Sequence, residues 1–166
     1  NPLLPERWYL SGYITPEVTV QGTYQTPQFK GQILVDSTYV QWAENQEPIQ
    51  QLQGSVQLKG RKFQLDQCSF RYLSYPINLT VSGDFSPKVN GSMQIQPDGK
   101  VQFSYTNQKT DSGEVSLGNV PFEFFQEYLP SDVSMDGKIT ANLRYFARAD
   151  SVSVSTEGQL IKTLQN

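Results

Sequence analysis

Residues 22–35 read GTYQTPQFKGQILV, and residues 83–95 repeat the phrase as GDFSPKVNGSMQI. Each version gives a glycine, an aromatic residue, a proline, one apolar residue and a second glycine, followed by apolar residues at alternate positions. Alternation with a period of two is typical of a β-strand with one buried face, and a proline before such a run indicates a turn. A phrase that recurs after about sixty residues predicts a repeating β structure.

The segments around the repeat follow the same pattern. Residues 77–82 (INLTVS) alternate strictly, which places Ile77, Leu79 and Val81 on one face of a strand and Asn78 and Thr80 on the other. Tight turns are predicted at residues 60–62 (GRK) and 97–100 (PDGK), each between two apolar runs. Short turns between strands favour an antiparallel meander. We therefore predict an all-β fold.

Residues 120–130 (VPFEFFQEYLP) depart from the strand pattern. Phe122, Phe125 and Leu129 are spaced as on one side of a helix, with Pro121 at its first turn and Pro130 beyond its end. This spacing predicts a helix of about two turns.

Composition excludes several classes of function. The 166 residues include 13 Lys+Arg and 16 Asp+Glu, without the basic excess of a nucleic-acid-binding protein. The sequence has no histidine, the commonest general base and zinc ligand, so we expect neither an enzyme nor a metal site, and no cofactor. The first residue is Asn1 rather than Met, so we expect a segment of a larger protein. The one cysteine, Cys68, lies in a strand pattern that predicts a buried, inert thiol.

The apolar positions of the strands form a set too large to leave in water on a soluble monomer. Either a second sheet covers them, as in a sandwich or barrel, or the sheet curls into a trough that holds acyl chains. The candidate lining residues of this trough are Ile33, Val35, Val56, Leu58, Phe63, Leu65, Ile77, Leu79, Val81, Met93, Ile95, Val101 and Phe103.

The repeated phrase and residues 120–143 (VPFEFFQEYLPSDVSMDGKITANL) together resemble the TamB branch of the AsmA-like superfamily. In that family a short amphipathic helix ending in Leu-Pro, here Leu129 and Pro130, precedes a glycine that starts a new strand, here Gly137. The resemblance covers most of the chain and implies a long antiparallel meander curled into an open groove, a β-taco. Residues 1–166 would be a single β-rich segment with approximate repeats 12–82 and 83–166.

The resemblance also implies a function. Such proteins carry phospholipids between the inner and outer bacterial membranes, and they work with an Omp85-type outer-membrane barrel protein. It implies a periplasmic location in a Gram-negative-type bacterium, with an anchor in the inner membrane through regions outside this chain; a chloroplast envelope relative is the other source. Two alternatives stay open: a scaffold that templates barrel proteins on an exposed strand edge, or an extracellular binding or adhesin β-sandwich.

Three smaller features each allow two interpretations. Trp42 with Tyr72 and Tyr75 fits either edge packing or a carbohydrate-stacking platform. The carboxylates of Asp132, Asp136 and Asp150 fit solvated turns or, far less well, a glycosidase pair. The terminal strands near residues 18–20 and 152–154 carry few charges and no strand-interior proline, so we expect the isolated segment to pair edge to edge.

Overall fold

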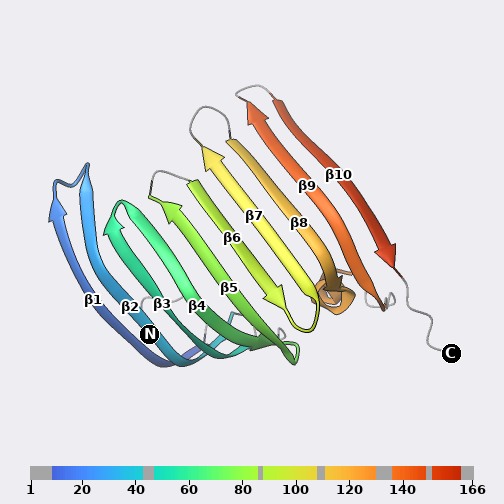
Figure 1. Cartoon of the computed structure of the whole chain (residues 1–166), viewed down its shortest axis with the longest axis horizontal. Coiled ribbons are helices and arrows are strands. Elements are labelled where there is room, and N and C mark those ends of the chain that lie inside the picture. Colours follow the sequence, from blue (N-terminus) through green and yellow to red (C-terminus); the bar gives the residue numbers. More distant parts are fainter. Residues whose placement is uncertain are drawn as a thin grey trace. The chain divides into compact units, whose positions relative to one another are not determined.

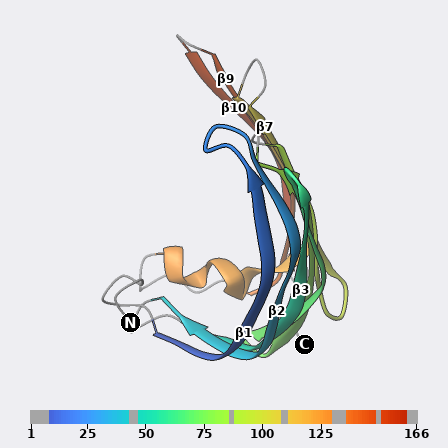
Figure 2. The same ribbon diagram turned by 90° about the vertical axis from the view of Figure 1, so that its left-hand side faces the viewer.

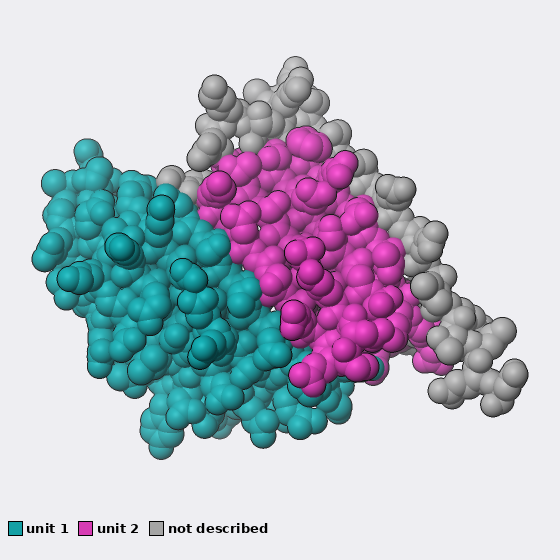
Figure 3. All heavy atoms as spheres, in the orientation of Figure 1, with its two compact units in different colours: residues 1–85 teal, residues 86–166 magenta. Residues whose placement is uncertain are grey.

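The computed structural model describes residues 9–42, 47–85, 88–107, 111–129, 136–148 and 151–161. The chain forms two compact units, residues 1–85 and residues 86–166, which are coloured separately in Figure 3.

The first unit is an antiparallel meander in which each strand pairs with the next along the chain (Figure 1). Its strands are β1 (Tyr9–Gly22), β2 (Pro27–Gln41), β3 (Ile49–Gly60), β4 (Lys62–Tyr72) and β5 (Tyr75–Asp84). β1 to β3 are curved along their length (Figure 2). The tight turn predicted at residues 60–62 is confirmed, since Arg61 alone separates β3 from β4.

The second unit repeats this plan with one helix added. Its elements are β6 (Lys88–Ile95), β7 (Gly99–Asn107), β8 (Asp111–Pro121), η1 (Phe122–Tyr128), β9 (Lys138–Arg148) and β10 (Ser151–Ile161). β6 to β10 are paired in chain order, all antiparallel. The predicted all-β fold, an open antiparallel meander with a short helix, is confirmed.

The helix differs from the prediction in type, because η1 is a 3-10 helix. It follows Pro121 directly, and it has no side-chain hydrogen bond at its N-terminus. The backbone N–H of Phe122 instead donates to the carbonyl of Gly137, 2.9 Å away, which ties the helix to the start of the next strand. Its seven residues make it long for a 3-10 helix, since runs of more than three or four residues are uncommon.

Bulges interrupt the pairing of the first unit in three neighbouring strands. Ser37, Gln51 and Gln67 lie at the register shifts of β2, β3 and β4, and each has a positive φ near 50° (49°, 54° and 51°). A bulge inserts one residue, bends its strand and increases the local twist. The extra residue in β4 also keeps Leu65 and Cys68 on the same face, opposite Val81 and Leu79.

Few side chains are fully buried among the described residues. In the first unit these are Thr38, Cys68 and Ile77, which lie in the part of the sheet that contains the bulges. In the second unit Ile95, Val120 and Phe122 are buried, close to where η1 follows β8. Each unit therefore has a small core at one end of its strands, and most of its apolar side chains are only half-buried.

Candidate functional site

The candidate lining residues of the first unit lie on one face of its sheet. Residues directly opposite in an antiparallel pair share a face, and the pairing places Ile33 opposite Val56, Val56 opposite Leu65, and Leu65 opposite Val81. Along the next row Leu58 is opposite Phe63. The set on this face, called the apolar face of the first unit below, is Ile33, Val35, Val56, Leu58, Phe63, Leu65, Ile77, Leu79 and Val81.

The second unit brings its own candidates together in the same way. Met93 is opposite Val101, and Phe103 is opposite Val115 in the next strand. Residues that the sequence interpretation missed extend this face: Leu117, opposite Val101, and Leu143, opposite Val115. They could have been found from the alternation of residues 115–117 and 139–143 in the printed sequence. The apolar face of the second unit consists of Met93, Ile95, Val101, Phe103, Val115, Leu117, Ile139 and Leu143.

Burial separates two kinds of residue on these faces. Ile77 and Ile95 are each 1% exposed and belong to the small cores. The other candidates are half-buried, so part of each side chain is open to an occupant of the face. Asn78 and Thr80 are exposed on the opposite face, as predicted.

Aromatic rings gather at the strand ends of the first unit near its β3–β4 turn. The ring of Phe85 lies 5.0 Å from that of Phe29 and 5.7 Å from that of Phe63, measured between centroids. The backbone N–H of Phe85 donates to the carbonyl of Arg61 at 2.8 Å. The equivalent aromatic of the first phrase, Tyr24, is fully exposed. The two copies of the phrase therefore use their aromatic residue differently.

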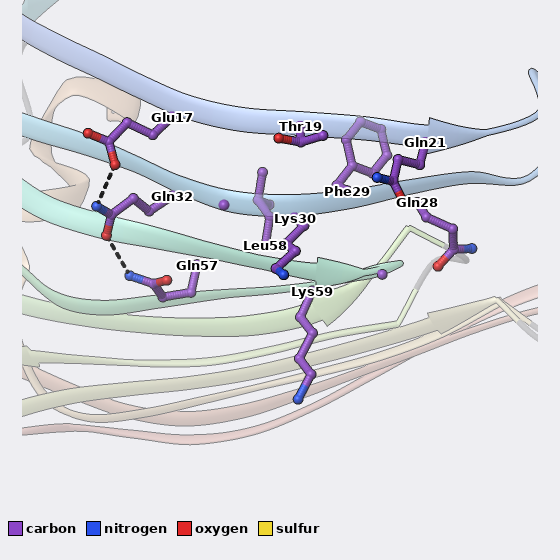
Figure 4. A pocket seen from close by; sticks show the side chains of 12 residues that line it. Glu17, Thr19, Gln21, Gln28, Phe29, Lys30, Gln32, Gln57, Leu58 and Lys59 are labelled. Carbon is purple, nitrogen blue, oxygen red and sulfur yellow. Dashed lines mark hydrogen bonds between the residues drawn. The ribbon is translucent and has the colours of Figure 1, made fainter.

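The opposite face of the first unit is polar and contains a hollow of about 780 Å³ (Figure 4). A chain of side-chain hydrogen bonds crosses three strands there. Gln57 Nε2 donates to Gln32 Oε1 at 3.2 Å, and Gln32 Nε2 donates to Glu17 Oε2 at 3.0 Å. The next row of this face holds Lys30 and Lys59, opposite each other on β2 and β3.

The other sequence candidates are placed as follows. Trp42 stacks on Tyr72 with ring centroids 6.2 Å apart, and Tyr72 is opposite Tyr75. Both stacked rings are half-buried, which fits packing. Cys68 is buried, as predicted, and loss of hydration raises the pKa of its thiol. Asp136 is exposed, whereas residues 132 and 150 lie outside the described residues.

The prediction of an edge without a strand-interior proline is wrong for the first unit. β1 extends well beyond residues 18–20, and both Pro16 and Glu17 lie inside it. Proline lacks an N–H group and an inward or edge charge discourages pairing, so both protect an edge strand. Residues 152–154 do lie in β10, within residues 151–161.

Among the described residues no three His, Cys, Asp or Glu side chains are grouped so that they could hold a metal ion. None of the described helical segments has the length and apolar character needed to cross a membrane. No family model, curated protein or solved structure matches the chain.

Proposed function

We propose that this chain is a segment of a TamB-like protein in which the apolar faces carry the acyl chains of phospholipids between two membranes. The observation that supports the proposal is the apolar face of each unit, which is contiguous, half-buried and part of an open sheet. The resemblance of the repeated phrase and of residues 120–143 to the family supports it independently.

Dimensions support an acyl chain as the occupant. Five strands spaced about 4.8 Å apart make the first unit about 19 Å wide, and seven residues along β2, from Phe29 to Val35, extend about 23 Å. The acyl tails of one leaflet are about 15 Å long, half of a bilayer core. Such a tail would remove the exposed apolar atoms of the face from water, and this burial stabilises the complex by about 25 cal/mol per Å² of apolar surface.

The same proposal places the parent protein in the periplasm, anchored in the inner membrane by other regions, with an Omp85-type barrel protein as a partner. The scaffold alternative depends on an open strand edge. Pro16 and Glu17 inside β1 weaken that alternative for this edge, because they hinder the pairing of an added strand.

Lipid extraction and native mass spectrometry of the purified chain test the proposal. We expect co-purified phospholipid with the unmodified chain and less of it with Leu79→Asp, because a carboxylate on the apolar face repels an acyl tail. The matched control is Asn78→Asp, which adds the same charge to the neighbouring, exposed position on the polar face. Lipid bound equally by both variants, or by neither variant nor the unmodified chain, would contradict the proposal.

A further variant separates lost binding from lost folding. Ile77 is buried, so Ile77→Asp places an unpaired carboxylate in the small core and should unfold the first unit. Leu79 is half-exposed and its carboxylate can reach water, so Leu79→Asp should remain folded by circular dichroism.

A further inference from the structure

One end of the first unit is basic, although the chain as a whole has a net charge of −3. Lys30, Lys59 and Lys62 are opposite one another on β2, β3 and β4, in a single row of the polar face. Arg61 lies in the turn beside them. The only carboxylate in this row is Asp84, opposite Lys62, and it lies 3.9 Å from the Arg61 guanidinium.

Like charges directly opposite on neighbouring strands are destabilising. The Lys30–Lys59 and Lys59–Lys62 pairs therefore lower the stability of the free protein, an effect that Asp84, opposite Lys62, offsets in part. The adjacent row of the same face satisfies its groups with the Gln57–Gln32–Glu17 hydrogen bonds. All three lysines are exposed, and no ion pair of theirs occurs among the described residues. An anionic partner would remove the repulsion.

Exposed apolar and aromatic side chains share this end. Tyr24 in the β1–β2 connection is fully exposed, Val20 is 59% exposed and Phe85 is 50% exposed. Pairing of Gly22 with Pro27, of Phe29 with Gly60 and of Phe63 with Gly83 places the β1–β2 turn, the β3–β4 turn and the end of β5 at the same end of the strands. Figure 4 shows the side chains of Lys30 and Lys59 pointing to one side of the sheet and the ring of Phe29 to the other.

We propose that this end, the basic tip (Val20, Tyr24, Lys30, Lys59, Arg61, Lys62 and Phe85), docks on a membrane surface that contains anionic phospholipids. Lysines near an anionic leaflet are attracted by its surface potential, and exposed aromatic rings favour the headgroup region. The row spans about 10 Å across three strands. That is short for a nucleic-acid duplex, where about 6–10 phosphates are contacted.

A small anion is bound best by the paired N–H donors of arginine. The basic tip instead offers mainly the single ammonium groups of lysines, without a buried polar partner, and these fit the spread-out negative charge of a membrane surface better. The lysines of the tip lie on the polar face, whereas Phe85 packs against Phe63 at the end of the apolar face. The inference depends on the lysines, so it stands apart from the transport proposal.

Vesicle co-sedimentation of the full chain tests the basic tip. The probes are vesicles of phosphatidylcholine alone and of phosphatidylcholine with about one-third phosphatidylglycerol, at low and at physiological salt. Each lysine contributes about fivefold near an anionic surface, so Lys59→Gln/Lys62→Gln should weaken binding to the anionic vesicles about thirtyfold. The matched control, Lys88→Gln/Lys100→Gln, removes two exposed lysines of the second unit and should bind as the unmodified chain does.

Several results would overturn the inference. These are equal binding to both kinds of vesicle, equal losses in the two double variants, and binding to a DNA duplex with none to anionic vesicles. Lys59→Gln/Lys62→Gln should still co-purify with phospholipid through the unchanged apolar face, which distinguishes failure of the tip from failure of the apolar face. Tyr24→Ser should weaken vesicle binding several-fold without changing its dependence on salt.

Discussion

The aromatic ring of Phe103 lies over Gly91, its partner in the β6–β7 pair, so closely that a Cβ atom at residue 91 would lie 2.7 Å from the ring Cε1. Gly91 is the second glycine of the repeated phrase. Its counterpart, Gly31, has a different reason to be glycine: its φ is +138°, and an added Cβ would meet the backbone carbonyl oxygen of Glu17. One motif position therefore serves ring packing in one unit and backbone conformation in the other.

This difference predicts unequal costs for the same substitution. Gly91→Ala should lower the free energy of unfolding by about 1–2 kcal/mol, because the Phe103 ring must move to admit a methyl group. Gly31→Ala should cost about 3 kcal/mol, because it combines a disfavoured φ with a clash against backbone. Urea unfolding of each variant measures both costs.

A double-mutant cycle supplies the control. Phe103→Leu should recover part of the loss in Gly91→Ala, since the smaller side chain leaves space over residue 91. Val18 is opposite Gly31, but no change of its side chain should recover the stability lost in Gly31→Ala, because the clash there is with backbone. Equal costs for the two glycines would contradict the separate roles.

Cys68 predicts a pH dependence of stability. Burial raises the pKa of its thiol, so the folded state favours the neutral form. The stability that the neutral thiol contributes to the folded state is therefore fully present below the unfolded-state pKa, about 8.5, and is lost as the pH rises through the folded-state pKa. Chemical unfolding of the unmodified chain should give a lower free energy of unfolding at pH 10 than at pH 7, and this decrease should be smaller in Cys68→Ala. The same decrease in both proteins would refute the assignment to Cys68.

Pattern and periodicity were sufficient to predict the strands and the faces. Alternation placed Ile77, Leu79 and Val81 together, because a period of two assigns each residue of a regular strand to a face. The bulges of β2, β3 and β4 could not be predicted, because glycine or asparagine usually marks a positive φ, whereas serine and glutamine occupy these three positions. Ser37, Gln51 and Gln67 adopt it because pairing on both sides of their strands fixes the register.

The candidate site was predicted in part for the same reason. Alternation determines which residues share a face of the sheet. Which of these residues are buried depends on packing between segments distant in sequence. Ile95 is buried near the start of η1, and no local pattern separates it from Met93, two residues earlier and half-buried. The basic tip likewise appears only when pairing aligns Lys30 with Lys59 and Lys62.

Removal of the edge proline should increase self-association. In the described part of the chain β1 pairs with β2 alone, and all 14 of its residues are exposed. Pro16→Thr restores a backbone N–H in the middle of this strand, so we expect a several-fold tighter dimer by sedimentation velocity. Pro76→Thr in β5 makes the same change away from β1 and should leave the mass distribution unchanged; dimer formation by both variants would show that the β1 edge is not responsible.

The bulge in β4 predicts that glycine stabilises one position and destabilises another in the same strand. Gln67 has a φ of 51°, a conformation that costs a residue with a Cβ about 1 kcal/mol and glycine nothing. Gln67→Gly should therefore raise the free energy of unfolding by several tenths of a kcal/mol, after the greater flexibility of glycine in the unfolded chain is offset.

Gln64 lies before the bulge, opposite Gln57 and Ser82 in the regular part of β4, and its Nε2 donates to Asp66 Oδ1 at 3.0 Å. Gln64→Gly should lower stability by about 1 kcal/mol, since glycine weakens an ordinary strand position. Urea midpoints that move in the same direction for both variants would show that the bulge at Gln67 does not hold the positive φ in solution.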